Sequence, residues 1–206
     1  MILASASPRR RELVEGVGLV PTVMPSTIDE TPQEGEDPEH LVRRLAEGKL
    51  EVALPHLLAQ PQERTALAAD TIVWTPDGQV LGKPQGPEDA AGMLRALSGC
   101  THHVSTGVAC AALVEGELRT TSFVERTAVT FHELTDAQIA AYVATGEPLD
   151  KAGAYGIQGE GRLLVSRIEG DYFNVVGLPV SRTVRELGQL LGEKDLVASV
   201  IQRSVR

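Results

Sequence analysis

The sequence predicts an α/β protein with a mixed central sheet flanked by helices. Short apolar runs typical of strands alternate along the chain with segments bounded by helix start and stop signals. Some strand runs are joined by tight Gly turns, as in hairpins, whereas others are separated by helices, as in crossovers. The use of both connections favours a mixed sheet over a doubly wound parallel one. We expect a single domain over residues 1–206, because no repeat, low-complexity tract or long linker divides the chain.

The first quarter of the chain predicts two strands and two helices. Ser7 and Pro8 are a favoured N-cap and first helical residue, and Gly16 with Gly18 ends that helix. The predicted elements are a strand over 1–5, a helix from 7 to 16, a strand over 21–24, a polar, Pro-rich loop over 26–40 and a helix over 38–54.

The remaining elements are predicted from the helical period of about 3.6 residues, from the strand period of two residues, and from Gly and Pro at turns and helix ends. They are a strand, a Pro-Asp-Gly turn and a returning strand within 64–82, a helix over 86–99, a hairpin of strands over 102–116 and 117–134, a helix over 135–146, two strands around a turn within 162–177 and a closing helix over 179–192. Residues 150–161 are Gly-rich, and we expect a polar, flexible loop there.

Composition excludes several classes of protein. The formal charge of −9 argues against a nucleic-acid polymer as partner, because nonspecific affinity for such polymers comes from basic surface. A small polyphosphate remains compatible, since a few clustered cations and a divalent metal can bind it. No segment approaches the length of a membrane span, and no apolar h-region follows the first basic residues. Cys100 and Cys110 form no disulfide framework, which favours reduced thiols and a cytoplasmic protein.

The stretch "SASPRRR" places hydroxyls and guanidinium groups where a strand turns into a helix. A helix N-terminus offers free backbone N–H groups and a positive dipole end. Ser5 and Ser7, with Arg9 and Arg10, would complete an anion site there. The alternative is a capped helix with solvated arginines, and this stretch alone leaves the two interpretations open.

Asp70 interrupts an otherwise apolar strand, in "AADTIVW". A buried carboxylate needs a partner or a chemical role, and a metal ligand or a general base would suit Asp70. The alternative is an Asp at the edge of a strand. Lys83, in "LGKPQ", follows the hairpin turn, which would return it towards the strand that bears Asp70. A lone Lys in a loop is otherwise usually just solvated.

The Gly-rich segment "DKAGAYGIQGEG" would let a backbone approach a ligand closely. Gln158 could read the edge of a base or could merely satisfy a turn. The glycines are no dinucleotide fingerprint, and the chain contains neither a P-loop nor a G-x-S-x-G elbow. His102 and His103 are adjacent on a predicted strand, so they point to opposite faces and cannot ligate one metal together.

Taken together, six blocks of the chain resemble the signature blocks of the Maf nucleotide pyrophosphatases, in order and over almost the whole length. They are "LASASPRRREL", "AADTIV", "LGKP", "MLRALSGCTHHVSTGV", "DKAGAYGIQG" and "GDYFNVVGLPVS". The resemblance implies hydrolysis of nucleoside triphosphates to the monophosphate and pyrophosphate with a divalent cation, Mg²⁺ or Mn²⁺. It also implies two lobes around a cleft, as in inosine-triphosphate pyrophosphatases, and a homodimer.

The resemblance also implies roles for eight residues, carried over by position. Glu30 is the least secure, because "STIDETP" leaves a one-residue ambiguity with Asp29. The implied roles are catalytic base and metal ligand for Asp70, metal ligand for Glu30, phosphate binding for Ser5, Lys49 and Lys83, and substrate specificity for Arg10, Thr71 and Gln158.

Within the family, the segment over 150–159 looks like the branch that acts on dTTP and UTP. The carboxamide of Gln158 could pair with the O4 and N3–H edge of thymine or uracil. Two other functions remain open from the sequence. One is a pyrophosphatase for modified pyrimidine nucleotides, and the other is a nucleotide-binding regulator of cell division that does not hydrolyse its ligand.

Overall fold

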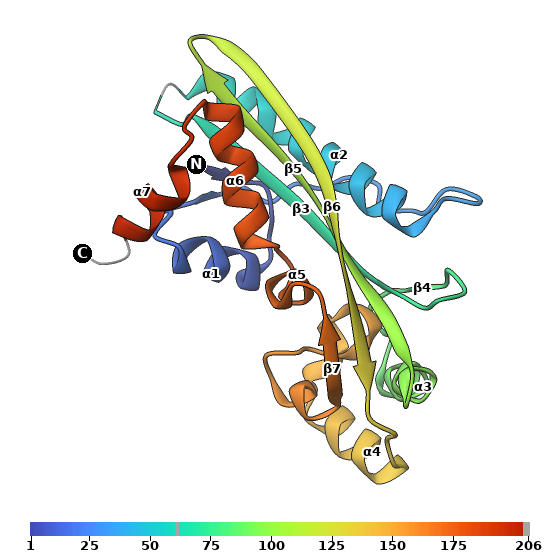
Figure 1. The fold of residues 1–206 in the computed structure, drawn as a ribbon. Helices are drawn as coiled ribbons and strands as arrows, with labels where there is room; N and C mark the ends of the chain where they lie inside the picture. The colour runs from blue at the N-terminus through green and yellow to red at the C-terminus, as the bar shows by residue number, and fades with distance from the viewer. Residues whose placement is uncertain (61, 204–206) are drawn as a thin grey trace. The chain divides into compact units, whose positions relative to one another are not determined.

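The computed structural model describes residues 1–60 and 62–203, and over these residues the chain forms seven strands, seven α-helices and three short 3₁₀ helices (Figure 1). The elements in chain order are β1 (Ile2–Leu3), α1 (Pro8–Gly16), β2 (Thr22–Val23), α2 (Pro38–Ala59), β3 (Thr65–Trp74), β4 (Val80–Leu81), α3 (Pro87–Leu97), β5 (Thr101–Val114), β6 (Glu117–Phe131), α4 (Asp136–Ala144), η1 (Glu147–Asp150), η2 (Ala152–Ala154), η3 (Glu160–Leu163), β7 (Val165–Glu169), α5 (Tyr172–Val176), α6 (Val180–Leu191) and α7 (Leu196–Arg203).

The strands pair in the order β2-β1-β3-β5-β6-β7, and β4 pairs with β3. β1 runs parallel to both β2 and β3, whereas β4 is antiparallel to β3 and β7 is antiparallel to β6. The prediction of a mixed sheet is therefore confirmed, as is the long hairpin of β5 and β6 (Figure 1). In the described part of the chain, no helix combines the length and the hydropathy needed to cross a bilayer.

The chain divides into two compact units. Unit 1 comprises Met1–Asp70, Thr106–Val124 and Gly177–Arg206. Unit 2 comprises Thr71–Ser105 and Glu125–Val176. The strands β3, β5 and β6 contribute residues to both units, and the boundary in β3 falls directly after Asp70. The predicted site residues are thus divided between two units, which are described separately below.

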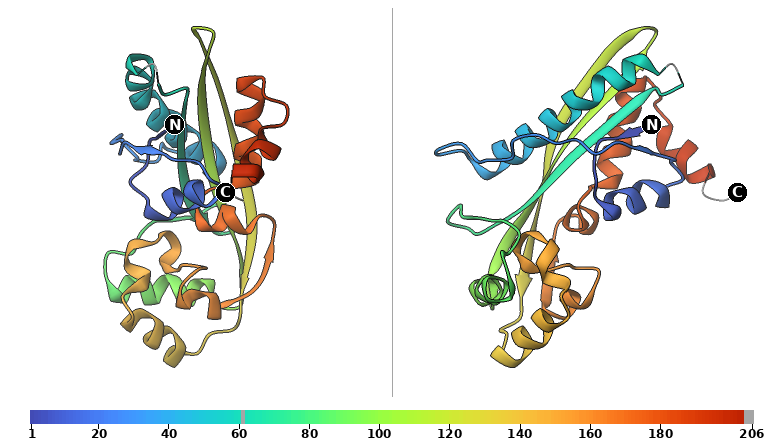
Figure 2. Two further views of the ribbon diagram at one scale, coloured as in Figure 1. Left: turned by 90° about the vertical axis from the view of Figure 1, so that its left-hand side faces the viewer. Right: turned by 180° about the vertical axis from the view of Figure 1, so that it is seen from behind.

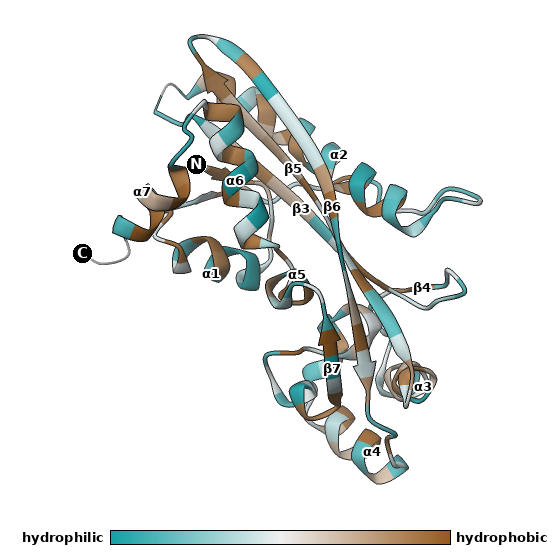
Figure 3. Ribbon diagram, viewed as in Figure 1, coloured by the Kyte–Doolittle hydropathy of each residue, from teal (hydrophilic) through white to brown (hydrophobic). Residues whose placement is uncertain are grey.

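In unit 1 the sheet lies between two helical layers (Figure 2). Alternate residues of a strand face opposite sides of a sheet, so Ala66 and Ala68 pack against α2 whereas Leu67 and Ala69 pack against α1, α6 and α7. All four side chains are fully buried or nearly so. Along α6, brown and teal residues alternate in Figure 3, as expected for a helix with one face on the sheet.

Helix α2 approaches the sheet closely because the residues at their contact are small. A Cβ atom built on Gly107 of β5 would lie 2.2 Å from the carbonyl oxygen of Val42 in α2. Ala46 and Ala53 of the same helix are fully buried against the sheet. This close approach brings the long polar side chains of α2 within reach of β3.

Unit 2 has its own apolar cluster, in which α3, α4 and the segment that joins η1 to η3 pack with residues of β3, β4, β5 and β6. His102 is fully buried in this cluster, and its ring lies edge-on to the rings of Phe131 and Tyr155. Burial lowers the pKa of His102 to about 4, so this histidine is a neutral core residue at physiological pH. Its neighbour His103 lies against Trp74, with ring centroids 4.5 Å apart.

Two predicted elements differ from the structure at the C-terminal end. The second of the two strands predicted within 162–177 is wrong, because residues 172–176 form α5. Asp171 accepts hydrogen bonds from the backbone N–H groups of Phe173 and Asn174, as a helix cap does. A short apolar run cannot distinguish a strand from a helix by periodicity, and here the cap decides. The prediction that α6 closes the chain is also wrong, because α7 follows it.

The prediction of a flexible polar loop over 150–161 is wrong as well. The segment contains the end of η1, all of η2 and the start of η3, and Ala154, Tyr155 and Ile157 are buried in it. The glycines therefore serve close packing: a Cβ on Gly153 would lie 2.8 Å from Cγ1 of Val73.

Candidate active site

The first part of the site is the turn between β1 and α1. Ser7 caps α1 by accepting a hydrogen bond from the Arg10 backbone N–H at 3.4 Å, as predicted. The buried Ser5 hydroxyl accepts from the Ser7 N–H at 3.2 Å and from Nη1 of Arg10 at 3.3 Å. Nε of Arg10 donates to the carbonyl oxygen of Gly177 at 2.8 Å. Arg11, by contrast, is exposed.

Arg10 is a partly buried cation in an acidic environment. Burial lowers the pKa of its guanidinium, and Arg9 adds to that effect, whereas the charges of Asp70 and Glu30 oppose it. Hydrogen bonds to Ser5 and to the Gly177 carbonyl hold the guanidinium in place. Sequence reasoning identified the serine and the arginine but missed the carbonyl, since a backbone group leaves no mark in the sequence.

The second part of the site is a lysine held between two carboxylates. Nζ of Lys49 lies 2.5 Å from Oδ1 of Asp70 and 2.6 Å from Oε1 of Glu30. The side chains of Lys49 and Asp70 are only 11 % and 13 % exposed, whereas that of Glu30 is 58 % exposed. One ammonium thus pairs with two carboxylates, of which that of Asp70 is largely shielded and that of Glu30 is open to solvent.

The positions of Lys49 in α2 and of Asp70 in β3 explain why these two side chains are in contact. Asp70 follows Ala66 and Ala68 at a spacing of two, so it extends the row of β3 that faces α2. Lys49 follows the buried Leu45 by one helical turn and therefore lies on the face of α2 that packs on the sheet. The sequence carried this second signal, because a Lys at an apolar helix position needs a buried partner.

Glu30 belongs to the polar loop between β2 and α2, and several contacts along α2 hold this loop. Nε and Nη2 of Arg44 each donate to the Glu36 carboxylate at 2.7 Å, and Nη2 also donates to the Thr31 carbonyl at 3.2 Å. Cδ1 of Ile28 lies 3.3 Å from a Cβ built on Gly48. The loop is therefore attached to the helix on both sides of Glu30.

Asp29 and Glu30 make different contacts in the structure. Asp29 accepts a hydrogen bond from the Thr31 backbone N–H at 2.9 Å, so it closes a local turn. Glu30 is the residue whose carboxylate reaches Lys49.

The pH dependence of the loop attachment can be predicted from Glu36. Hydrogen bonds from Arg44, against an opposing effect of burial, lower the pKa of Glu36 from 4.5 to about 2. A carboxyl with a depressed folded-state pKa stabilises the fold fully above its unfolded value and loses that contribution as pH falls through the folded value. We therefore expect Glu36→Gln to unfold at lower urea concentration than the wild type at pH 6, and this difference to shrink between pH 4.5 and about 2.

Urea unfolding of both proteins across this pH range checks the expectation. Glu34→Gln is the control, because it removes one negative charge from an exposed residue of the same loop. Its urea unfolding midpoint should equal that of the wild type at every pH. A difference between Glu36→Gln and the wild type that is constant from pH 6 to pH 2 would contradict it.

A divalent cation is compatible with this donor set. Asp70 and Glu30 present hard carboxylate oxygens that meet at one cation, the Lys49 ammonium. In the described residues, no group of three His, Cys, Asp or Glu side chains is placed to hold a metal ion. Mg²⁺ is commonly bound by one or two carboxylates together with water and substrate phosphates, so two carboxylates suffice when a triphosphate supplies the other ligands.

Three predicted site residues lie in unit 2. The predicted hairpin is confirmed, with Val73 opposite Leu81, and the exposed Lys83 follows β4 by two residues. The carbonyl of Gly82 accepts a hydrogen bond from the Gly153 N–H at 3.0 Å, so the Gly-rich segment is joined to this hairpin. Thr71 is the first residue of unit 2 and is partly buried in β3. Gln158 lies in the Gly-rich segment and is exposed.

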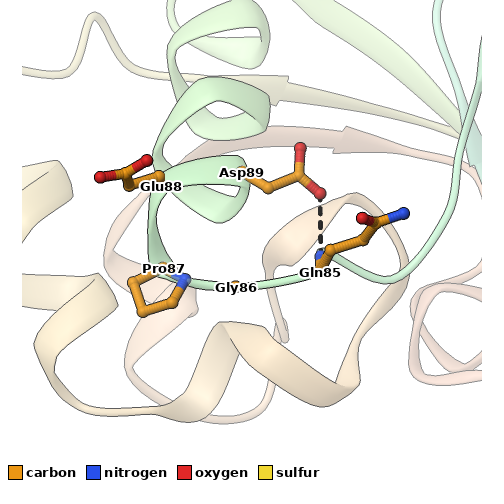
Figure 4. A pocket seen from close by; sticks show the side chains of 5 residues that line it. All are labelled: Gln85, Gly86, Pro87, Glu88 and Asp89. Carbon is orange, nitrogen blue, oxygen red and sulfur yellow. Dashed lines mark hydrogen bonds between the residues drawn. The ribbon is translucent and has the colours of Figure 1, made fainter.

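A pocket at the start of α3 is lined by none of these three residues (Figure 4). Its lining consists of residues 85–89, and Asp89 accepts a hydrogen bond from the Gln85 N–H at 2.9 Å across it. Glu88 and Asp89 make the pocket acidic, which does not suit a phosphate ligand.

Comparison with known proteins agrees with the six sequence blocks. Residues 1–190 match the family described as Maf-like protein. The chain belongs to the Maf family. A dTTP/UTP pyrophosphatase from Geobacillus sp. (strain WCH70) is 50 % identical over 190 residues, which are 92 % of this chain and 97 % of that protein. A second protein of that name, from Moorella thermoacetica (strain ATCC 39073 / JCM 9320), is 53 % identical over 192 residues, 93 % of this chain and 95 % of its own.

A third Maf relative, from Bacillus cereus (strain AH820), is also named dTTP/UTP pyrophosphatase and is 48 % identical over 189 residues, 92 % of this chain and 94 % of its own. The resemblance stated from the sequence is thereby confirmed at the level of the family. The match covers all eight residues to which that resemblance assigned roles.

Proposed function

We propose that the protein is a nucleoside triphosphate pyrophosphatase that hydrolyses dTTP and UTP to the monophosphate and pyrophosphate. The observation that carries the proposal is the buried Lys49 ammonium held between Asp70 and Glu30, in the unit that also holds Arg10 on Ser5. Cations and carboxylates so arranged suit a polyphosphate and its metal. The name shared by relatives of about 50 % identity supports the choice of nucleotide.

In this reaction a water oxygen bonds to phosphorus at the α–β anhydride, and the bond to the departing pyrophosphate breaks. Asp70 accepts the proton of the attacking water, a role that typically contributes about 10²–10⁴-fold to the rate. Lys49 and Arg10 bind phosphate oxygens and offset the charge that develops as pyrophosphate leaves. Ser5 keeps the Arg10 guanidinium in place and offers its hydroxyl to the same anion.

Asp70 and Glu30 are the residues that would hold Mg²⁺ or Mn²⁺. When bound, the metal supplies Lewis-acid stabilisation of the phosphate charge. Lys49 then has a second role in the proposal, because its ammonium reduces the repulsion between the two carboxylates before the metal and substrate arrive.

In unit 2, we assign recognition of the base to Gln158, with Thr71 as a second specificity residue and Lys83 as a phosphate ligand. The Gln158 side chain is exposed and therefore accessible to a ligand. Its carboxamide offers one acceptor and two donors, which match the N3–H and O4 of thymine and uracil.

A panel of triphosphates tests this function. The protein is incubated with Mg²⁺ and dTTP, UTP, CTP, 7-methyl-GTP, 5-methyl-UTP, pseudo-UTP or 5-methyl-CTP, and pyrophosphate release is measured. We expect the highest kcat/KM for dTTP and UTP. Release from none of them would favour the nonhydrolytic regulator, and a preference for 7-methyl-GTP with dTTP inert would refute the assignment to the dTTP/UTP branch.

A preference for 5-methyl-UTP, pseudo-UTP or 5-methyl-CTP would make modified pyrimidine nucleotides the substrates.

The proposal also places the reaction in the cytoplasm and in a homodimer. The free thiols of Cys100 and Cys110 support the compartment. The homodimer is proposed from the family resemblance, and light scattering of the purified protein tests it.

A further inference from the structure

We propose that Glu147 and Tyr155 are positioning residues that hold Gln158 in place to read the base. This inference rests on the proposed function, since it concerns the residue assigned there to the pyrimidine edge. All the contacts that carry it lie within unit 2. They hold the backbone on both sides of Gln158 while leaving its own side chain exposed.

Glu147 holds the backbone that follows Gln158. Its Oε2 accepts a hydrogen bond from the Glu160 N–H at 2.8 Å, and its Oε1 accepts one from the Gly161 N–H at 3.3 Å. Oε1 also accepts from the hydroxyl of Tyr142 at 2.8 Å. One carboxylate therefore satisfies two consecutive N–H groups that η3 leaves without helical partners at its start.

The packing around Glu147 is as close as the hydrogen bonding. A Cβ atom built on Gly159, the residue directly after Gln158, would lie 2.2 Å from Oε2 of Glu147. A Cβ on Gly161 would lie 2.5 Å from the Gly156 carbonyl oxygen and 2.7 Å from the hydroxyl oxygen of Tyr142. The backbone therefore packs directly on the Glu147 carboxylate at Gly159, and on the Gly156 carbonyl and the Tyr142 hydroxyl at Gly161.

Tyr155 holds the backbone that precedes Gln158. It is 5 % exposed, and its hydroxyl lies 2.9 Å from Nε2 of the fully buried His102. The next residue, Gly156, donates its N–H to the hydroxyl of Tyr142 at 3.1 Å. Tyr142 thus joins the two sides, since the same hydroxyl donates to Glu147.

The charge on Glu147 is preserved at neutral pH. Burial raises the pKa of Glu147. Hydrogen bonds from the Glu160 and Gly161 N–H groups and from Tyr142 lower this pKa by more than burial raises it, so the net shift is downward. Lys151 contributes a positive charge nearby, and its Nζ donates to the Glu147 carbonyl at 2.7 Å. An ionised carboxylate accepts all three of its hydrogen bonds at once, whereas a carboxamide in its place cannot.

Fixing this backbone bears on specificity rather than on chemistry. UTP and CTP differ only at the base edge that Gln158 is proposed to read. If Gln158 lay on a mobile segment, each binding event would cost the free energy of ordering that segment. The side chain could then also adapt to the edge of either uracil or cytosine. A backbone held at 155, 156, 160 and 161 limits the positions that the carboxamide can reach, so a base whose edge does not match it there is left with unpaired polar groups.

The test compares the ratio of kcat/KM for UTP to that for CTP in four proteins. We expect Glu147→Ala to lower this ratio by about 3- to 10-fold, the discrimination that one hydrogen bond supplies, and Tyr155→Phe to lower it less. Glu160→Gln is the matched control, because it removes a negative charge from the same segment while keeping the N–H that Glu147 accepts. A variant that merely folds poorly loses both activities equally and leaves the ratio unchanged.

Hydrogen exchange of the free protein gives a second readout that needs no substrate. The amide hydrogens of Glu160, Gly161 and Gly156 should exchange faster in Glu147→Ala than in the wild type and in Glu160→Gln. A wild type that does not hydrolyse UTP would contradict the proposed function. A wild type that prefers UTP, with Glu147→Ala keeping the same ratio and the same exchange, would overturn this inference alone.

Discussion

Replacing Asp70 by asparagine is expected to lower kcat for dTTP by at least about 10²-fold. The asparagine side chain has nearly the same shape, and its amide oxygen still accepts the hydrogen bond from Lys49. It cannot accept a proton from water at neutral pH, and it is a weaker ligand for a divalent cation. Steady-state kinetics of pyrophosphate release at saturating dTTP and Mg²⁺ measures the effect.

Two measurements separate this loss from a loss of structure. The thermal unfolding midpoint should change by only a few degrees in Asp70→Asn, since the buried ammonium keeps an acceptor. Glu51→Gln, an exposed change of the same charge two residues after Lys49 on α2, should keep wild-type turnover. Wild-type turnover in Asp70→Asn would remove this residue from the catalytic role.

Much of unit 1 follows from the sequence because its signals are local. Ser7 and Pro8 start α1 as their chemistry dictates. The period of two along β3 places Asp70 on the face of the sheet that α2 covers. The pairing of Asp70 with Lys49 then depends only on two regular elements packing together.

Contacts made by irregular backbone could not be predicted in the same way. The Gly177 carbonyl that accepts from Arg10 is separated from it by 167 residues and is chemically like every other carbonyl. The glycines at 159 and 161 suggested flexibility from composition, whereas the Glu147 carboxylate that they fold over lies outside the Gly-rich segment. Glycine permits flexible backbone and tightly packed backbone alike, and only the tertiary partner decides between them.

The error at α5 has a related cause. The alternation of polar and apolar residues from 165 to 176 fits two strands, and β7 is one of them. In the second half, Asp171 caps the backbone and the fully buried Asn174 donates its side-chain amide to the Val104 carbonyl and to the Thr127 hydroxyl, each at 3.0 Å. These long-range hydrogen bonds to β5 and β6 favour a helical turn over a weak strand pattern.

Replacing Lys49 by methionine should separate its two proposed roles. We expect kcat/KM for dTTP to fall by about 10²–10³-fold, the loss typical of removing one group that stabilises developing negative charge. We expect Mn²⁺ to bind nucleotide-free Lys49→Met more tightly than it binds the wild type, because Asp70 and Glu30 lose the ammonium that competes for their oxygens. Pyrophosphate release and calorimetric titration of Mn²⁺ without nucleotide measure the two effects.

The opposite direction of these two effects makes the experiment decisive. A lysine that only supported the fold would, when removed, weaken hydrolysis and metal binding together. Lys194→Met, which removes an exposed cation from the same unit, should change neither. Hydrolysis at the wild-type rate in Lys49→Met would mean that Lys49 does not contact the phosphates, and weaker Mn²⁺ binding would mean that Asp70 and Glu30 need the lysine to stay together. Tighter Mn²⁺ binding with lost hydrolysis would instead mean that the ammonium holds the place of the metal until the nucleotide arrives.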